Sequence, residues 1–208
     1  MTRSQVLDVA EHAFASAGFH NTSIKSIAER CEIAVGTIYT LFEDKDSIYE
    51  AVLRRRGAAL HALTEAKASE SGPADTTLVQ LAELQIRYFR EHSDWAELAS
   101  ALGSGARVAP PGAGSSHLYE VGHQVVADVL ADVMARGQRE GRIRDGNPQA
   151  LALIFLGMLE TFHRIDNANH AERPDYGLVE FLDLVHAAFS APGPGEGNSG
   201  SPQPRRGR

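Results

Sequence analysis

The chain has a single cysteine, Cys31, among its 208 residues, so no disulfide can form within it. A disulfide-stapled secreted fold is therefore excluded, and a reducing cytoplasm is the expected location. Long apolar runs are also missing, because the longest, residues 150–159, is about half of the ~20 residues that span a bilayer. No charged-then-apolar leader opens the sequence, so we expect neither secretion nor a membrane segment.

Positive charge is scarce, since 20 Lys and Arg residues stand against 27 Asp and Glu and the formal net charge is −7. Such acidity argues against generic affinity for nucleic acid. The excess of acidic over basic residues is uneven along the chain. Residues 1–57 hold 7 basic and 8 acidic residues, whereas the remainder holds 13 basic and 19 acidic residues. Any binding to DNA must then depend on individually placed contacts rather than on a basic field.

The usual signatures of catalysis are missing as well. The nine histidines form no His-x-x-x-His pair and no Cys/His cluster, and the sequence has no Gly-rich phosphate loop and no Gly-x-Ser-x-Gly. His117 and His123 are six residues apart and would point to different faces of a helix. We expect a protein that is not an enzyme and that needs no cofactor or metal.

Apolar residues recur at helical spacing along most of the chain, which predicts an all-α fold of about nine helices. These helices are expected to begin near residues 2, 23, 35, 44, 76, 94, 117, 148 and 176. Thr2-Arg3-Ser4-Gln5 has the form of a capping box, and Asn147-Pro148 combines an N-cap with a proline in the first helical position. Residues 103–116 are rich in Gly, Pro and Ser and are expected to form a loop.

The first three expected helices have helix-turn-helix spacing. Glu32-Ile33-Ala34 forms a three-residue turn before a very short helix, Val35–Leu41. Its apolar residues can pack inward, which leaves slim and hydroxyl-bearing residues on the outer face: Gly36, Thr37, Tyr39 and Thr40. A helix that enters the major groove needs a slim leading end and hydrogen-bonding groups, and this face offers both.

Two further residues would contact the DNA backbone in this arrangement. Ser23, at the start of the second helix, offers a hydroxyl and free amides to a phosphate. Lys45, at the start of the fourth helix, would supply a cation. The alternative from the residues alone is a plain three-helix subdomain whose hydroxyls are simply solvated.

The same segment resembles a known family. Arg3-x-x-Val6-Leu7-x-x-Ala10, Phe14-x-x-x-Gly18-Phe19, Thr22-Ser23-Ile24, Ile27-Ala28, Gly36-Thr37-Ile38-Tyr39-x-x-Phe42 and Lys45 fall in register with the DNA-binding domain of TetR-type repressors. The resemblance covers about residues 2–51, roughly a quarter of the chain. It implies a homodimeric transcriptional repressor without catalytic activity, which binds a palindromic operator and is released by a small-molecule effector. It also supports DNA contacts by Ser23, Thr37, Tyr39 and Lys45.

The sequence departs from the family at the turn, which usually reads Gly-Val-Ser. Glu32 stands at a turn position that suits glycine better, and Ala34 lacks the hydroxyl that would cap the next helix, a loss of about 1 kcal/mol. Arg54-Arg55-Arg56 lies on the fourth helix. This run either faces the DNA or forms a solvated face of a long surface helix.

The resemblance and the helix pattern together divide the chain. Residues 1–50 form the expected DNA-binding domain, and the fourth helix links it as far as about residue 68. Residues 74–191 form a ligand-binding and dimerisation domain, and residues 192–208 form a disordered tail that is rich in Pro, Gly, Ser and Arg.

Aromatic and imidazole side chains in the second domain suggest an apolar cavity for a small, hydrophobic, partly aromatic effector. The candidate lining residues are Phe89, Trp95, His123, Phe162 and His163. Ordinary core and surface positions are the alternative for each of them.

The helix that begins at Pro148 is apolar around most of its circumference, so it is expected to be buried on two sides. With the last helix it can form a four-helix dimer interface, which would place two recognition helices about 34 Å apart. The candidate interface residues are Phe155, Gly157, Leu178, Phe181, Leu182 and Val185. The alternatives are that these residues form one subunit's core, and that the chain is a helical ligand-binding or protein-interaction module without DNA binding.

Overall fold

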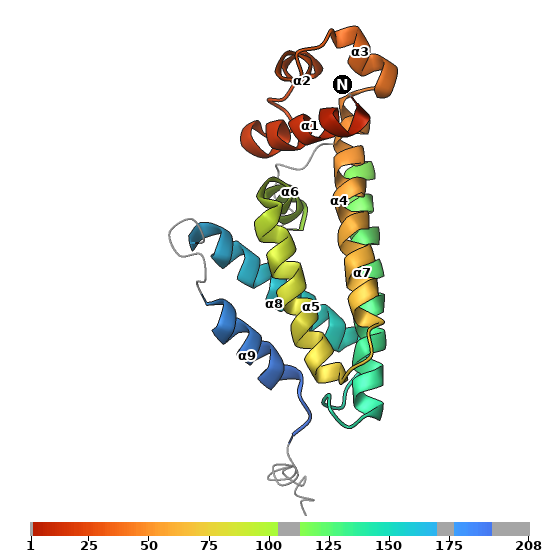
Figure 1. The fold of residues 1–208 in the computed structure, drawn as a ribbon, viewed down its shortest axis with the longest axis vertical. Helices are drawn as coiled ribbons and strands as arrows, with labels where there is room; N and C mark the ends of the chain where they lie inside the picture. The colour runs from red at the N-terminus through yellow and green to blue at the C-terminus, as the bar shows by residue number, and fades with distance from the viewer. Residues whose placement is uncertain (1, 104–112, 170–176, 193–208) are drawn as a thin grey trace, which may run out of the picture.

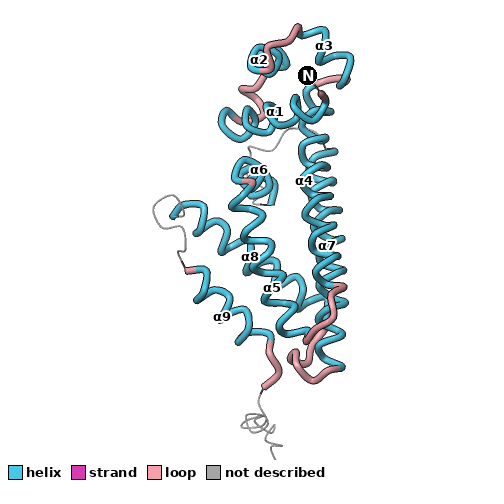
Figure 2. Tube along the Cα trace, viewed as in Figure 1, coloured by secondary structure: helices cyan, strands magenta, loops and turns pink. Residues whose placement is uncertain are grey.

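The computed structural model describes residues 2–103, 113–169 and 177–192, and the fold is described for these residues (Figure 1). They form nine helices, and their only β-type pairing is an isolated bridge between Ile143 and Ser190 (Figure 2). The helices are α1 (Arg3–Ala17), α2 (Ile24–Arg30), α3 (Val35–Leu41), α4 (Lys45–Ala68), α5 (Ala74–Glu91), α6 (Ser93–Gly103), α7 (Ala113–Arg139), α8 (Pro148–Asn169) and α9 (Leu178–Phe189). The prediction of an all-α fold is confirmed.

The helix starts follow the local capping signals. Thr2 and Gln5 exchange backbone and side-chain hydrogen bonds in the predicted capping box of α1. Ser23 forms a similar box at the start of α2. The Asn147 side chain accepts a hydrogen bond from the Ala150 backbone at 3.0 Å, at the start of α8. These bonds join residues three apart, so the starts of α1, α2 and α8 are decided within one turn of sequence.

One loop prediction is partly wrong. Residues 103 and 113–116 were expected in a loop, but Gly103 ends α6 and α7 begins at Ala113. Small polar residues such as Gly and Ser are compatible with helix ends as well as with loops, and this is why composition misplaced the boundary. Residues 104–112 and the tail at 193–208 lie outside the described residues.

Two hydrophobic cores lie at the two ends of the molecule. The first is built from α1 to α4, with Phe14, Ile27 and Ile38 among its fully buried members, and Leu98 of α6 also belongs to it. The second is built from α5, α7, α8 and α9. Helix α4 runs from the first core along the flank of α7, and the two helices pack side by side (Figure 1). Helix α4 therefore belongs to the first core and also packs on a helix of the second.

No helix in the described ranges combines the length and hydrophobicity that crossing a bilayer requires.

Candidate DNA-binding surface and ligand pocket

Helix α3 presents its polar face to solvent. Ile38 is fully buried in the first core, and this orients the opposite face outward. The exposed residues on that face are Gly36, Thr37, Tyr39 and Thr40. Tyr39 is 56% exposed, and a Cβ added at Gly36 would meet no atom within 4 Å. The structure thus brings the four candidate residues of α3 together on one open surface, and their contact with DNA remains a prediction.

Lys45 has a structural task that the sequence did not suggest. Its ammonium donates hydrogen bonds to the backbone carbonyls of Phe19 at 2.8 Å and Thr22 at 3.0 Å. It also lies 4.1 Å from the centroid of the Phe19 ring, a cation–π contact. Because an ammonium has three N–H groups, one is left for a phosphate. The main contacts of Lys45 thus hold the loop after α1 against the start of α4.

The turn before α3 has the unfavourable features expected from Glu32 and Ala34, which replace the usual Gly and Ser of the family's turn. Glu32 has a φ of 55°, a left-handed conformation that costs a residue with a Cβ more than it costs glycine. Ala34 is the N-cap of α3 and makes no side-chain capping bond. The hydroxyl of Ser23, in contrast, accepts a hydrogen bond from the Ser26 backbone and so already caps α2.

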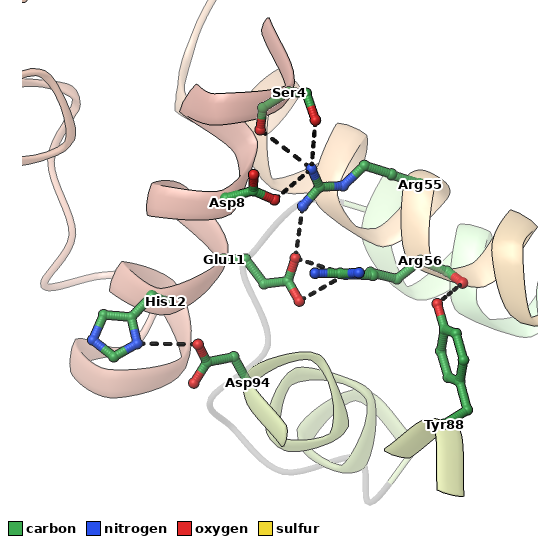
Figure 3. A network of polar contacts seen from close by, with 8 residues as sticks. All are labelled: Ser4, Asp8, Glu11, His12, Arg55, Arg56, Tyr88 and Asp94. Atoms are coloured by element: carbon green, nitrogen blue, oxygen red, sulfur yellow. Dashed lines mark hydrogen bonds and ion pairs between the residues drawn. The ribbon is translucent and has the colours of Figure 1, made fainter. Parts of the chain in front are cut away.

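The arginine run on α4 is neither a DNA-facing row nor a uniformly solvated face. Arg54 is exposed and pairs with Glu50 on the same helix. Arg55 and Arg56 instead reach α1, where both bind the Glu11 carboxylate at 2.8 and 2.9 Å (Figure 3). Glu11 is only 3% exposed, so this ion pair lies at a buried joint between α1 and α4.

The joint continues towards the second domain. The backbone carbonyl of Arg56 accepts a hydrogen bond from the Tyr88 hydroxyl of α5 at 2.9 Å (Figure 3). The Tyr88 ring meets Trp95 of α6 edge-on, with 5.9 Å between centroids. A chain of contacts thus runs from Glu11 through α4 and Tyr88 to Trp95.

A cavity of about 240 Å³ lies behind α4 and is walled by α4, α5, α6, α7 and α8. Phe89, Trp95, His123 and His163 line it, and their contact with a ligand stays a prediction. Phe162 does not line it. Its ring stacks on Phe181 with centroids 4.2 Å apart inside the second core, because it points to the other side of α8. Tyr119, another aromatic residue of this region, also lines the cavity. Gln85 and Glu160 line it too and were not predicted, since no local pattern marks them.

Polar groups are few and specific in this cavity. Glu160 pairs with His123 at 3.2 Å and accepts a hydrogen bond from Tyr119 at 3.3 Å. The hydrogen bond from His123 holds the pKa of Glu160 below its usual range. Burial lowers the pKa of His163 to about 4, so its imidazole is neutral at pH 7. Within the described part of the chain, no group of three or more His, Cys, Asp or Glu residues could hold a metal ion.

The candidate interface residues are mostly in this chain's own core, which corrects their predicted placement. Phe155, Leu178, Phe181 and Val185 are buried there, and Leu182 packs against them. Gly157 alone among the six is exposed. The exposed apolar side chains of α8 and α9 include Leu153, Ile154, Val179 and Leu184. Periodicity identified two apolar helices but did not say which of their apolar residues face this subunit.

The comparisons with known proteins agree with this geometry. A family model described as "Bacterial regulatory proteins, tetR family" matches residues 6–52, which include α2, α3 and the joint residue Glu11. The transcriptional repressor AcnR of Corynebacterium efficiens is 27% identical over 194 residues, which cover 92% of this chain and 94% of AcnR. Residues 6–52 of this chain are thus similar to the TetR family of bacterial regulatory proteins.

Other known proteins resemble a segment of the sequence or the fold alone. The regulator UidR of Escherichia coli is 36% identical over 52 residues, which make up about a quarter of this chain and of UidR. FadR from Bacillus subtilis, solved in complex with stearoyl-CoA, has the same fold with a TM-score of 0.75 and 18% identity. That alignment covers 89% of this chain and 96% of FadR.

Proposed function

We propose that this chain is a TetR-type regulator, a cytoplasmic homodimeric repressor that holds a palindromic operator with two copies of α3. A small molecule in the cavity behind α4 releases it from the DNA. The observation that carries the proposal is that α4 forms a wall of the cavity and is also fastened, by the ion pair of Arg56 with Glu11 of α1, to the helices that include the open polar face of α3.

The contacts to DNA are expected from α3 and its surroundings. Gly36 permits close approach of the backbone, and the hydroxyls of Thr37, Tyr39 and Thr40 reach base edges or phosphates. Ser23 and the third N–H of Lys45 add phosphate contacts. Because Arg55 and Arg56 are engaged by Glu11, few cations are left to face the DNA. Non-specific affinity should therefore be weak, and the loss of affinity with added salt should be shallow.

Dimerisation is expected through α8 and α9. Leu153 and Ile154 on α8 and Val179 and Leu184 on α9 expose apolar surface that a second subunit would cover. Gly157 is exposed between them on α8 and would let two helices approach closely. Two helices from each subunit would form a four-helix bundle and set the distance between the two copies of α3.

Release follows from the position of α4. Leu53, Gly57 and Leu60 of this helix line the cavity, while Arg56 of the same helix holds α1 through Glu11. A ligand that binds more tightly to a displaced arrangement of α4 shifts the population towards it and changes the separation of the two copies of α3. Reading the operator requires one particular separation, so DNA affinity falls.

The test is selection of bound duplexes from fragmented genomic DNA with the purified chain, at a stated salt concentration, beside the variant Tyr39→Ala. Tyr39 is largely exposed, so the variant should fold. We expect a pseudo-palindrome that the variant fails to enrich. If neither low nor moderate salt yields a preferred sequence, the proposal is wrong and a helical ligand-binding or interaction module takes its place.

A further inference from the structure

We propose that the effector is an uncharged, mainly apolar molecule whose carbonyl-type oxygen accepts hydrogen bonds from Gln85 and Trp95. This inference rests on the proposed effector role of the cavity and specifies the chemistry of its occupant.

The first step concerns two buried donors. The Trp95 Nε1 and Gln85 Nε2 atoms have no hydrogen-bond partner among the residues that the structure describes, although the two residues are only 6% and 4% exposed. Buried N–H groups in native proteins are nearly always paired, since an unpaired one has lost water and gained nothing. Both residues line the cavity. An indole N–H can only donate, so a ligand that satisfies it must present an acceptor.

The second step concerns the body of the ligand. Most of the remaining wall is apolar and includes Leu53, Leu60, Phe89, Ala99, Leu156 and Leu159. A volume of about 240 Å³ corresponds to roughly eight water molecules at ~30 Å³ each. That space fits an aromatic ring with a short chain, and transfer of such a body from water is favourable.

The third step concerns charge. Among the described lining residues, Glu160 is already paired with His123 and Tyr119, and Arg54 is paired with Glu50. Beside His163, Arg90 and Asp166 are paired with each other at 2.8 Å. His163 itself is neutral at pH 7, and its Nε2 has no partner within the described ranges of the chain. A carboxylate or an ammonium would therefore lose its hydration without gaining an unpaired counter-charge.

The chain supplies its own reporter for the test. Trp95 is the only tryptophan in the sequence, so tryptophan fluorescence reports occupancy of the cavity without any DNA. Four ligands with similar phenyl-alkyl bodies separate the alternatives: benzylacetone is a neutral ketone, butylbenzene has no polar group, phenylbutyrate is an anion and phenylbutylamine is a cation. We expect benzylacetone to bind at least about tenfold more tightly than either charged ligand.

The variant Gln85→Leu tests the hydrogen bond directly. We expect it to weaken benzylacetone about tenfold while butylbenzene changes by less than about twofold, because only the ketone loses a donor. Leu156→Met is the matched control, since it alters the apolar wall and should affect both ligands alike. Removing an unpaired buried amide should not impair folding, which thermal unfolding checks, and Gln85→Met provides a second variant without the donor.

Three outcomes overturn the inference: tightest binding by phenylbutyrate or phenylbutylamine, an equal effect of Gln85→Leu on the ketone and the hydrocarbon, or no fluorescence response to benzylacetone up to its solubility limit. If benzylacetone gives no fluorescence response while the chain still binds its operator, the proposed ligand class is wrong and the proposed DNA-binding function is unaffected. If benzylacetone binds more tightly than the charged ligands but does not release the chain from its operator, the ligand class is supported and the effector role of the cavity is refuted.

Discussion

The Nε atom of Arg56 lies 2.9 Å from both carboxylate oxygens of Glu11, and this contact fastens α1 to α4 (Figure 3). Arg55 binds the same carboxylate at 2.8 Å and also reaches Asp8 and Ser4. One buried carboxylate thus receives two guanidinium groups at the boundary between the DNA-binding helices and the rest of the chain. Because Arg56 also meets Tyr88 through its carbonyl, this joint is where motion of α4 would reach the DNA-binding helices.

Glu11→Gln should lower the free energy of unfolding by about 2 kcal/mol, because two part-buried guanidinium groups lose their shared anion. Solvent around the arginines keeps the cost below that of a fully buried pair. Urea unfolding followed by circular dichroism measures this change in the free energy of unfolding. Asp8→Asn is the matched control, since Asp8 binds the same Arg55 but is exposed, and it should cost less than about 1 kcal/mol. Equal effects of the two variants would contradict a central role for Glu11.

Lys45→Met should destabilise the chain by about 1–2 kcal/mol in the absence of DNA, because the carbonyls of Phe19 and Thr22 lose their shared donor. Lys25→Met is the control, since Lys25 is well exposed and pairs only with Glu29 at 3.7 Å. If both variants unfold at the same urea concentration as the parent chain, the hydrogen bonds of Lys45 do not stabilise the fold and the prediction is wrong.

Ala34→Ser should raise the free energy of unfolding by about 1 kcal/mol, because the new hydroxyl can cap the uncapped start of α3. The backbone of Ala34 already has the extended conformation of an N-cap, with φ −67° and ψ 142°. Ala34→Val adds an apolar side chain without a hydrogen-bonding oxygen and should give no gain. An equal effect of serine and valine would show that capping is not the cause.

His163 makes stability depend on pH. Its pKa is lowered to about 4 in the folded chain and is about 6.5 when unfolded, so only the unfolded chain takes up this proton between those values. Stability is therefore lost as pH falls from about 6.5 towards 4, by at most about 3 kcal/mol. Urea unfolding at pH 7 and pH 5 measures the loss of stability between the two pH values, and His163→Gln should remove the part of this loss that is due to His163. An unchanged pH dependence in the variant would assign the loss to other groups.

The sequence by itself determined the features that depend on neighbours within a turn or two. The capping bonds of Thr2, Ser23 and Asn147 join residues three apart, so the starts of these three helices could be predicted directly. The buried Ile38 likewise oriented α3, which placed Tyr39 and its neighbours on the open face. These contacts form whenever the helix forms, so spacing alone predicts them.

Only the tertiary structure decided the contacts between helices far apart in the chain. Arg55 and Arg56 are more than 40 residues from Glu11, and no local pattern distinguishes them from the solvated Arg54. The side of α8 that Phe162 and Phe155 occupy depends on where α9 packs. A helix that is apolar all round has no face that its own sequence marks as inward, so packing against other helices selected the core, the cavity and the exposed surface.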